Sequence, residues 1–112
     1  MPLSQWDHED DLEAFLQEKG SGFIFKHSTR CGVSSEALRE VQKLLDGQAD
    51  IPVFCVLVIE NRATSNAVSE SLGVVHASPQ IILLREGKMA WQASHWEITA
   101  DHLAEAWAAE KA

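Results

Sequence analysis

The fold is decided where a strand turns into a helix, within Gly22-Phe23-Ile24-Phe25-Lys26-His27-Ser28-Thr29-Arg30-Cys31-Gly32-Val33-Ser34. The first residues of this stretch predict a short buried strand, and the amphipathic pattern after Cys31 predicts a helix. A thiol at such a junction lies in the field of the helix N-terminus, which favours the thiolate, the nucleophilic form of cysteine. Cys31 is therefore the candidate catalytic residue of a redox-active domain.

The rest of the chain alternates between helical and strand patterns. We expect helices at residues 7–19, 32–46, 62–72 and 99–110, with Asp7 capping the first, and strands at residues 22–27, 52–59, 80–85 and 88–93. The second strand is apolar on both faces, as in a covered parallel strand. This order predicts an α/β, thioredoxin-like fold with a central mixed four-stranded sheet and helices on both faces. We expect one domain over residues 1–112.

A second landmark, Ser78-Pro79, precedes the third expected strand. An X-Pro bond can be cis, and in this fold such a loop brings its backbone beside the thiol. We expect Pro79 to shape the substrate groove and Ser78 to offer backbone groups to an extended ligand. The alternative is a proline that merely begins a strand.

Several side chains surround the thiol in the sequence. Arg30 adjoins it, Lys26 and His27 end the preceding strand, and His76 is expected to flank it. Ser34 stands where a dithiol protein carries its resolving cysteine. Because serine forms no disulfide, a mixed disulfide on Cys31 must be resolved by an external thiol. The alternative is that Cys31 only begins the helix and has no chemical role.

Composition narrows the class of protein further. The 112 residues carry a formal net charge of −8, which argues against nucleic acid and anionic membranes as partners. Cys55 lies in an expected core strand, so we expect no disulfide with Cys31 and a reducing, cytoplasmic location. The acidic, polar segment from Met1 to Asp11 does not resemble a signal peptide. Without a Cys-x-x-Cys or His-x-x-x-His spacing, no metal site is expected.

Four blocks of the sequence resemble the YtxJ-like family, the monothiol bacilliredoxins. The resemblance extends over about residues 4–107, and its blocks are Phe25-Lys26-His27-Ser28-Thr29-Arg30-Cys31 with Ser34, Ile59-Glu60-Asn61-Arg62 with Ser65-Asn66-Ala67, Gly73-Val74 to His76 with Ser78-Pro79-Gln80, and Ala93-Ser94-His95-Trp96 with Ile98-Thr99. It implies a thioredoxin-like enzyme that removes bacillithiol, a low-molecular-weight thiol, from mixed disulfides on cytoplasmic client proteins.

Carried onto this chain, the resemblance makes Cys31 the attacking and thiol-accepting residue. Bacillithiol would be a co-substrate, and no tightly bound cofactor is implied. The partners would be bacillithiolated client proteins and the small thiol itself. The residues predicted to contact the substrate are Arg30, Gly32, Ser34, His76, Ser78 and Pro79.

The chain departs from the family at Gly32, where proline is usual. Cys31-Gly32-Val33-Ser34 thereby also resembles the Cys-Gly-Phe-Ser motif of monothiol glutaredoxins, which use glutathione and can share an iron–sulfur cluster. Those proteins carry a Gly-Gly pair after the cis-proline, where this chain has Ile81-Ile82-Leu83. A glutaredoxin-like protein is therefore one alternative, and a non-catalytic thioredoxin-fold interaction module is another.

Overall fold

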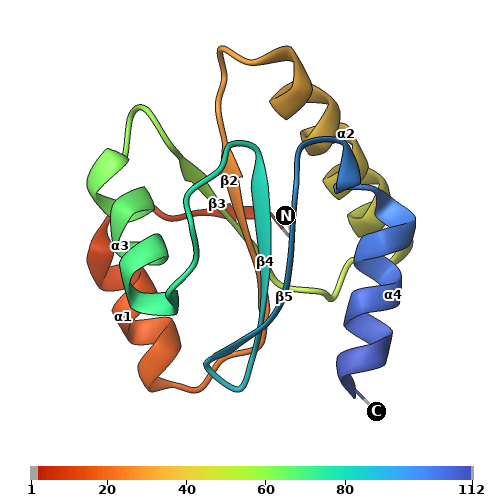
Figure 1. Ribbon diagram of the computed structural model, residues 1–112. Coiled ribbons are helices and arrows are strands. Elements are labelled where there is room, and N and C mark those ends of the chain that lie inside the picture. Colours follow the sequence, from red (N-terminus) through yellow and green to blue (C-terminus); the bar gives the residue numbers. More distant parts are fainter. Residues whose placement is uncertain (1–2, 112) are drawn as a thin grey trace.

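A computed structural model describes residues 3–111. The chain forms a central sheet with α1 and α3 on one face and α2 and α4 on the other (Figure 1). Its elements are β1 (Leu3–Gln5), α1 (Glu9–Gln17), β2 (Gly22–His27), α2 (Gly32–Gly47), β3 (Val53–Leu57), α3 (Arg62–Leu72), β4 (Gln80–Arg85), β5 (Lys88–Ser94), the short 3₁₀ helix η1 (His95–Glu97) and α4 (Ala100–Lys111).

The sheet is mixed, as predicted, but it has five strands in the order β1-β3-β2-β4-β5. β2 and β3 are parallel, β4 runs antiparallel to β2, and β5 antiparallel to β4. The expectation of four strands was wrong because β1 adds an edge strand parallel to β3. β1 is only three residues long, so it is too short for an alternating apolar pattern to reveal it.

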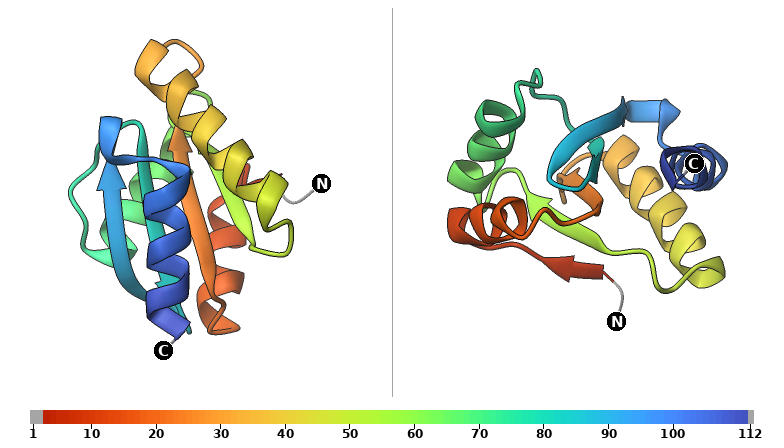
Figure 2. Two further views of the ribbon diagram at one scale, coloured as in Figure 1. Left: turned by 90° about the vertical axis from the view of Figure 1, so that its right-hand side faces the viewer. Right: turned by 90° about the horizontal axis from the view of Figure 1, so that it is seen from below.

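The two faces of the sheet carry separate cores. All six residues of β2 are buried, and they alternate between the two faces. Phe23 and Phe25 pack with residues of α2 and α4, whereas Ile24 packs with residues of α1 and α3. The right-hand view of Figure 2, from below, shows the sheet between these two helical layers. Both layers therefore fix β2, the strand that leads to Cys31.

The first helix begins later than predicted, because His8 rather than Asp7 caps it. The His8 side chain accepts a hydrogen bond from the Asp10 N–H, and the Asp11 carboxylate accepts one from the His8 N–H. This reciprocal pair is a capping box. The Asp7 carboxylate instead accepts hydrogen bonds from Gln5 and Asn61, so it ties α1 to the start of α3.

The strand register brings the parts of the candidate site to one edge of the sheet. His27 ends β2 opposite Leu57 at the end of β3, and Lys26 pairs with Gln80 at the start of β4. Gln80 in turn pairs with Ser94 at the end of β5. The segment from Ser28 to Cys31, the loop before β4 and the η1 helix therefore lie at the same edge.

Replacing Gly22 by alanine should destabilise the protein, since a Cβ there would lie 2.8 Å from the Pro52 carbonyl oxygen. We expect a loss of roughly 1–3 kcal/mol in the free energy of unfolding. Gly47→Ala is the matched control, because a Cβ at Gly47 meets nothing within 4 Å. Urea unfolding measures both variants, and equal effects would contradict the close approach of β2 to Pro52.

Candidate active site

Cys31 lies at the N-cap of α2, as the sequence predicts, with an extended backbone (φ −123°, ψ 123°). Its N–H donates to the Ser28 carbonyl at 3.4 Å, and its carbonyl accepts from the Ser35 N–H at 3.1 Å. The residue is partly exposed and its thiol is free. A nucleophile here is held by backbone hydrogen bonds while its sulfur remains open to a substrate.

Ser34 joins the end of β2 to the first turn of α2. Its Oγ accepts a hydrogen bond from the Ser28 N–H at 2.9 Å and lies 2.7 Å from His27 Nδ1. The Ser34 side chain is fully buried and does not reach the surface on which a substrate would dock. The prediction that Ser34 contacts substrate is therefore corrected, because its hydroxyl is occupied within the protein.

His27 is buried beneath the thiol segment. Its ring stacks on Phe25, with centroids 5.4 Å apart. Burial lowers the pKa of His27 below its usual value, although the Glu60 charge and a hydrogen bond to the Ser34 backbone act in the opposite direction. The ring and the Ser34 hydroxyl share a hydrogen bond, while the same hydroxyl accepts from the Ser28 N–H.

Lys26 points to the other face of the sheet, into the layer of α1 and α3. The side chain is fully buried, and its Nζ donates to Ser69 Oγ at 2.6 Å and to His76 Nδ1 at 3.0 Å. Burial lowers the pKa of Lys26 to about 8. The sequence predicts Lys26 near the thiol but not its burial. The available signal was that Lys26 follows four apolar residues, Gly22 to Phe25, in a strand expected to be buried.

The loop before β4 carries Ser78 and Pro79, and the peptide bond between them is cis. Pro79 is buried, and its carbonyl accepts a hydrogen bond from the His95 N–H at 3.0 Å. The Gln80 side chain secures the same loop by donating to the Val75 carbonyl at 3.0 Å. The loop and η1 are thus joined directly at the edge where Cys31 lies.

The remaining predicted substrate contacts are open to solvent. Arg30, Gly32 and His76 are exposed, and a Cβ at Gly32 would meet nothing within 4 Å. Ser78 is partly buried, and its hydroxyl oxygen is enclosed with no hydrogen-bond partner among the described residues. Arg30 and Gly32 adjoin Cys31 in the chain, and His76 and Ser78 lie in the loop before β4, at the same edge of the sheet.

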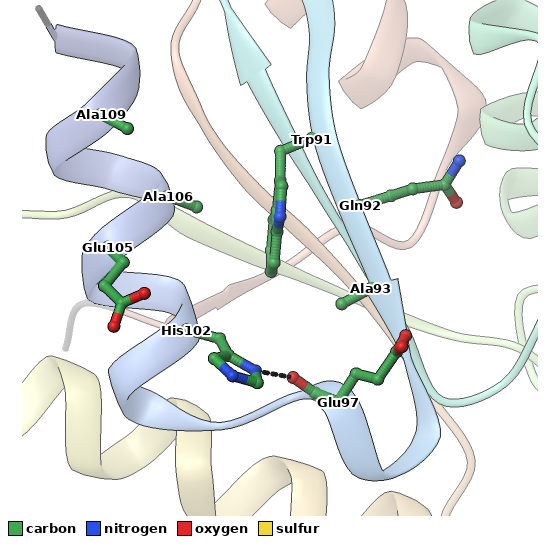
Figure 3. A pocket seen from close by; sticks show the side chains of 8 residues that line it. All are labelled: Trp91, Gln92, Ala93, Glu97, His102, Glu105, Ala106 and Ala109. Atoms are coloured by element: carbon green, nitrogen blue, oxygen red, sulfur yellow. Dashed lines mark hydrogen bonds between the residues drawn. The ribbon is translucent and has the colours of Figure 1, made fainter.

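A small hollow of about 130 Å³ adjoins the thiol segment between α2 and η1. Its lining combines apolar side chains with two carboxylates, and it consists of Val33, Glu36, Ala37, Glu40, His95, Trp96, Ile98 and Thr99. A larger hollow of about 430 Å³ lies between β5 and α4 (Figure 3). Neither hollow is lined by the predicted site residues, but the smaller one includes Val33, two residues after Cys31, and His95, whose N–H bonds to the Pro79 carbonyl.

The described part of the chain holds no group of three His, Cys, Asp or Glu residues placed to bind a metal ion. Among residues 3–111, no helix has the length and apolar character needed to cross a membrane. Cys55 is buried on β3, and burial raises the pKa of its thiol to about 11. Of the two cysteines, only Cys31 is therefore accessible to a substrate.

Replacing Lys26 by methionine should change how stability depends on pH. Because the pKa of Lys26 falls from 10.5 in the unfolded chain to about 8 in the folded one, the unfolded state binds more protons between these values. Stability due to this group therefore rises as the pH increases above 8. From about pH 7 to pH 9, the wild type should gain about 1 kcal/mol relative to Lys26→Met.

Denaturant titrations at several pH values measure this gain. Lys43→Met is the matched control, because Lys43 is exposed, and its pH profile should parallel that of the wild type. The range stays below pH 9 because Cys55, whose pKa is raised to about 11, contributes a loss of stability at higher pH. A Lys26→Met profile parallel to the wild type would contradict a buried ammonium at this position.

Replacing Ser34 by alanine should leave the buried Ser28 N–H without an acceptor. We expect a loss of about 1–3 kcal/mol in the free energy of unfolding. The neighbouring Ser35→Ala is the matched control, since Ser35 is exposed, and it should change stability by less than about 0.5 kcal/mol. Chemical denaturation of both variants checks this, and similar values would argue against the proposed anchoring role of Ser34.

The family model described as "Monothiol bacilliredoxin BrxC" matches residues 4–103. A solved structure described as a thioredoxin-fold protein and candidate oxidoreductase is 27% identical, with a TM-score of 0.86, over 95% of this chain and 94% of that one.

Thioredoxins themselves are more distant. Thioredoxin from Fasciola hepatica is 20% identical with a TM-score of 0.71, over 91% of this chain and 93% of that one. Thioredoxin from Trypanosoma brucei brucei is 14% identical with a TM-score of 0.75, over 95% of this chain and 88% of that one. At these identities the likeness establishes the thioredoxin fold alone. Together with the family match, it shows that the chain belongs to the monothiol bacilliredoxin family and is a thiol–disulfide oxidoreductase with a thioredoxin fold.

Proposed function

We propose that this protein uses Cys31 to remove bacillithiol from mixed disulfides on cytoplasmic client proteins. The observation that carries the proposal is an open thiol at the N-cap of α2 whose counterpart three residues later is the buried Ser34. A thiol without a neighbouring cysteine accepts a small thiol and holds it until another thiol arrives. Membership of the monothiol bacilliredoxin family supports bacillithiol as that small thiol.

The proposed reaction has two exchange steps. In the first, the Cys31 thiolate attacks the bacillithiol sulfur, so a bond forms between these two sulfurs and the bond to the client sulfur breaks. The client leaves as a thiolate and takes a proton from water. In the second, a further thiol attacks the mixed disulfide on Cys31. The products are a small-molecule disulfide and the Cys31 thiolate, and the incoming thiols supply the electrons.

Exposed apolar side chains around the thiol support a protein as the first substrate. Val75 is 88% exposed, Trp96 70% and Ile59 43%. Val75 precedes the cis-proline, Trp96 follows β5 and Ile59 follows β3, so all three lie toward the Cys31 edge of the sheet. Exposed apolar residues gathered at one edge are typical of a surface that contacts other proteins.

Most of the residues that we propose to contact the substrate have side chains or backbone open to solvent near Cys31. Arg30 and His76 offer positive or hydrogen-bonding groups beside the thiol, and Gly32 leaves space for the mixed disulfide. Ser78 would pair through its backbone with an extended segment, and Pro79 would form the wall of the groove. Ser34 would act by positioning the segment that carries Cys31. No tightly bound cofactor is needed for these steps.

Intact-mass spectrometry should detect one bacillithiol on Cys31 after the reduced protein is mixed with a bacillithiolated client. Cys31→Ser should gain no adduct and leave the client modified. Cys55→Ala is the matched control, since Cys55 is buried and should not take part in the exchange. This variant should gain the adduct as the wild type does.

A glutathionylated client measured in parallel tests the identity of the small thiol. Faster transfer of glutathione than of bacillithiol would favour a glutaredoxin-like activity instead. No adduct of either kind on Cys31 would contradict thiol exchange at this residue.

A further inference from the structure

Three basic side chains meet on the α3 side of the thiol edge: Lys26, Arg62 and His76. Lys26 Nζ lies 3.0 Å from His76 Nδ1. Partial burial lowers the pKa of His76, and the positive charges of Lys26 and Arg62 lower it further. The ion pairs recorded among the described residues are His8–Asp10, Arg39–Glu36 and Lys43–Glu40, so none of them involves these three. These groups are notable in a chain with a formal net charge of −8, although the Asp7 carboxylate also lies close to Arg62, where it accepts a hydrogen bond from Asn61.

Lys26 determines which nitrogen of His76 carries a proton. An ammonium group donates hydrogen bonds and accepts none, so His76 Nδ1, 3.0 Å from Lys26 Nζ, must be the unprotonated acceptor. The neutral ring then carries its proton on Nε2. Because His76 is exposed while Lys26 is fully buried, this arrangement leaves the Nε2–H available as a donor to a ligand.

Arg62 adds a second set of donors on the same side. It is the first residue of α3 and is exposed, and the first turn of that helix contains no acidic residue. Arg62 and Ser69, the hydroxyl partner of Lys26, are seven residues apart, which places them on one face of α3. Glu60 lies nearby, but its carboxylate is engaged with the Thr29 hydroxyl at 3.4 Å.

The opposite flank of the thiol offers no comparable pair of donors. The small hollow between α2 and η1 is lined by the carboxylates of Glu36 and Glu40, which are ion-paired with Arg39 and Lys43. An anionic group on a ligand at Cys31 would therefore find its donors on the α3 side. Guanidinium pairs well with carboxylate, since its planar donors match two carboxylate oxygens.

We propose that Arg62 and His76 bind a carboxylate of the small thiol that is carried on Cys31, and that Lys26 is a positioning residue which orients His76 as an Nε2–H donor. This inference rests on the proposed thiol exchange at Cys31. It specifies in addition that the small thiol carries a carboxylate group.

The test is an equilibrium competition between glutathione and its neutral-carboxylate analogue, glutathione diethyl ester. The protein is equilibrated with both thiols and their disulfides, and intact-mass spectrometry measures the ratio of the two adducts on Cys31. Relative to the wild type, Arg62→Gln should lower the ratio of glutathione adduct to ester adduct by about tenfold, the scale of one charge-assisted hydrogen bond. His76→Leu should lower it in the same direction.

Lys88→Gln is the matched control, because Lys88 is exposed at the start of β5, at the other end of the sheet, and its loss changes the net charge equally. Its adduct ratio should match that of the wild type. Equal ratios in the wild type, Arg62→Gln and His76→Leu would overturn the carboxylate site while leaving thiol exchange intact. Absence of both adducts in a protein that still forms the bacillithiol adduct would overturn a carboxylate site open to this class of thiol, whereas absence of all three adducts would overturn the exchange reaction.

The positioning role of Lys26 has a separate spectroscopic readout. In the wild type, the ¹⁵N chemical shifts of the His76 ring should be those of the Nε2–H tautomer. In Lys26→Met they should move toward a mixture of the two neutral tautomers, because the donor that fixes Nδ1 is gone. Unchanged shifts in a folded Lys26→Met variant would overturn this role.

Discussion

The Ser34 hydroxyl is the contact on which the geometry of the thiol depends. It accepts a hydrogen bond from the Ser28 N–H and bonds to His27, so it joins the end of β2 to the first turn of α2. Cys31 lies between these anchored points, and its own N–H bonds to the Ser28 carbonyl. The position that carries the resolving thiol in a dithiol protein is thus used here for structure. A serine at position 34 therefore means that there is no resolving thiol, and its hydroxyl also anchors the segment that carries Cys31.

The two flanks of the thiol differ in shape and in the side chains that they present, and under the proposed function this difference orients a ligand. On the α2 side lie a small hollow, an exposed Trp96 and two carboxylates. On the α3 side, the buried Lys26 ammonium directs His76 outward, with Arg62 nearby. A mixed disulfide joins two unlike partners, a protein and a small molecule. A site with two unlike flanks can bind the protein on one side of Cys31 and the small molecule on the other.

Much of the fold followed from the sequence, because its patterns are local. Hydrophobic periodicity and glycine stops located the four helices and four of the five strands, and the strand-to-helix junction located Cys31. The features that sequence reasoning missed depend on contacts distant in the chain. β1 is defined by its pairing with β3. The burial of Lys26 depends on Ser69 and His76, which lie 43 and 50 residues away. Ser34 was assigned to the ligand because sequence position cannot show which way a helical side chain points.

The burial of Cys55 limits how many sulfur atoms of the protein can exchange with thiols in solution. Its thiol is enclosed in the core, and its pKa is raised to about 11, so it stays protonated and out of reach in a neutral compartment. Under the proposed exchange, each molecule therefore carries at most one small thiol, on Cys31. The fraction of loaded molecules would then follow how oxidised the surrounding pool of small thiols is.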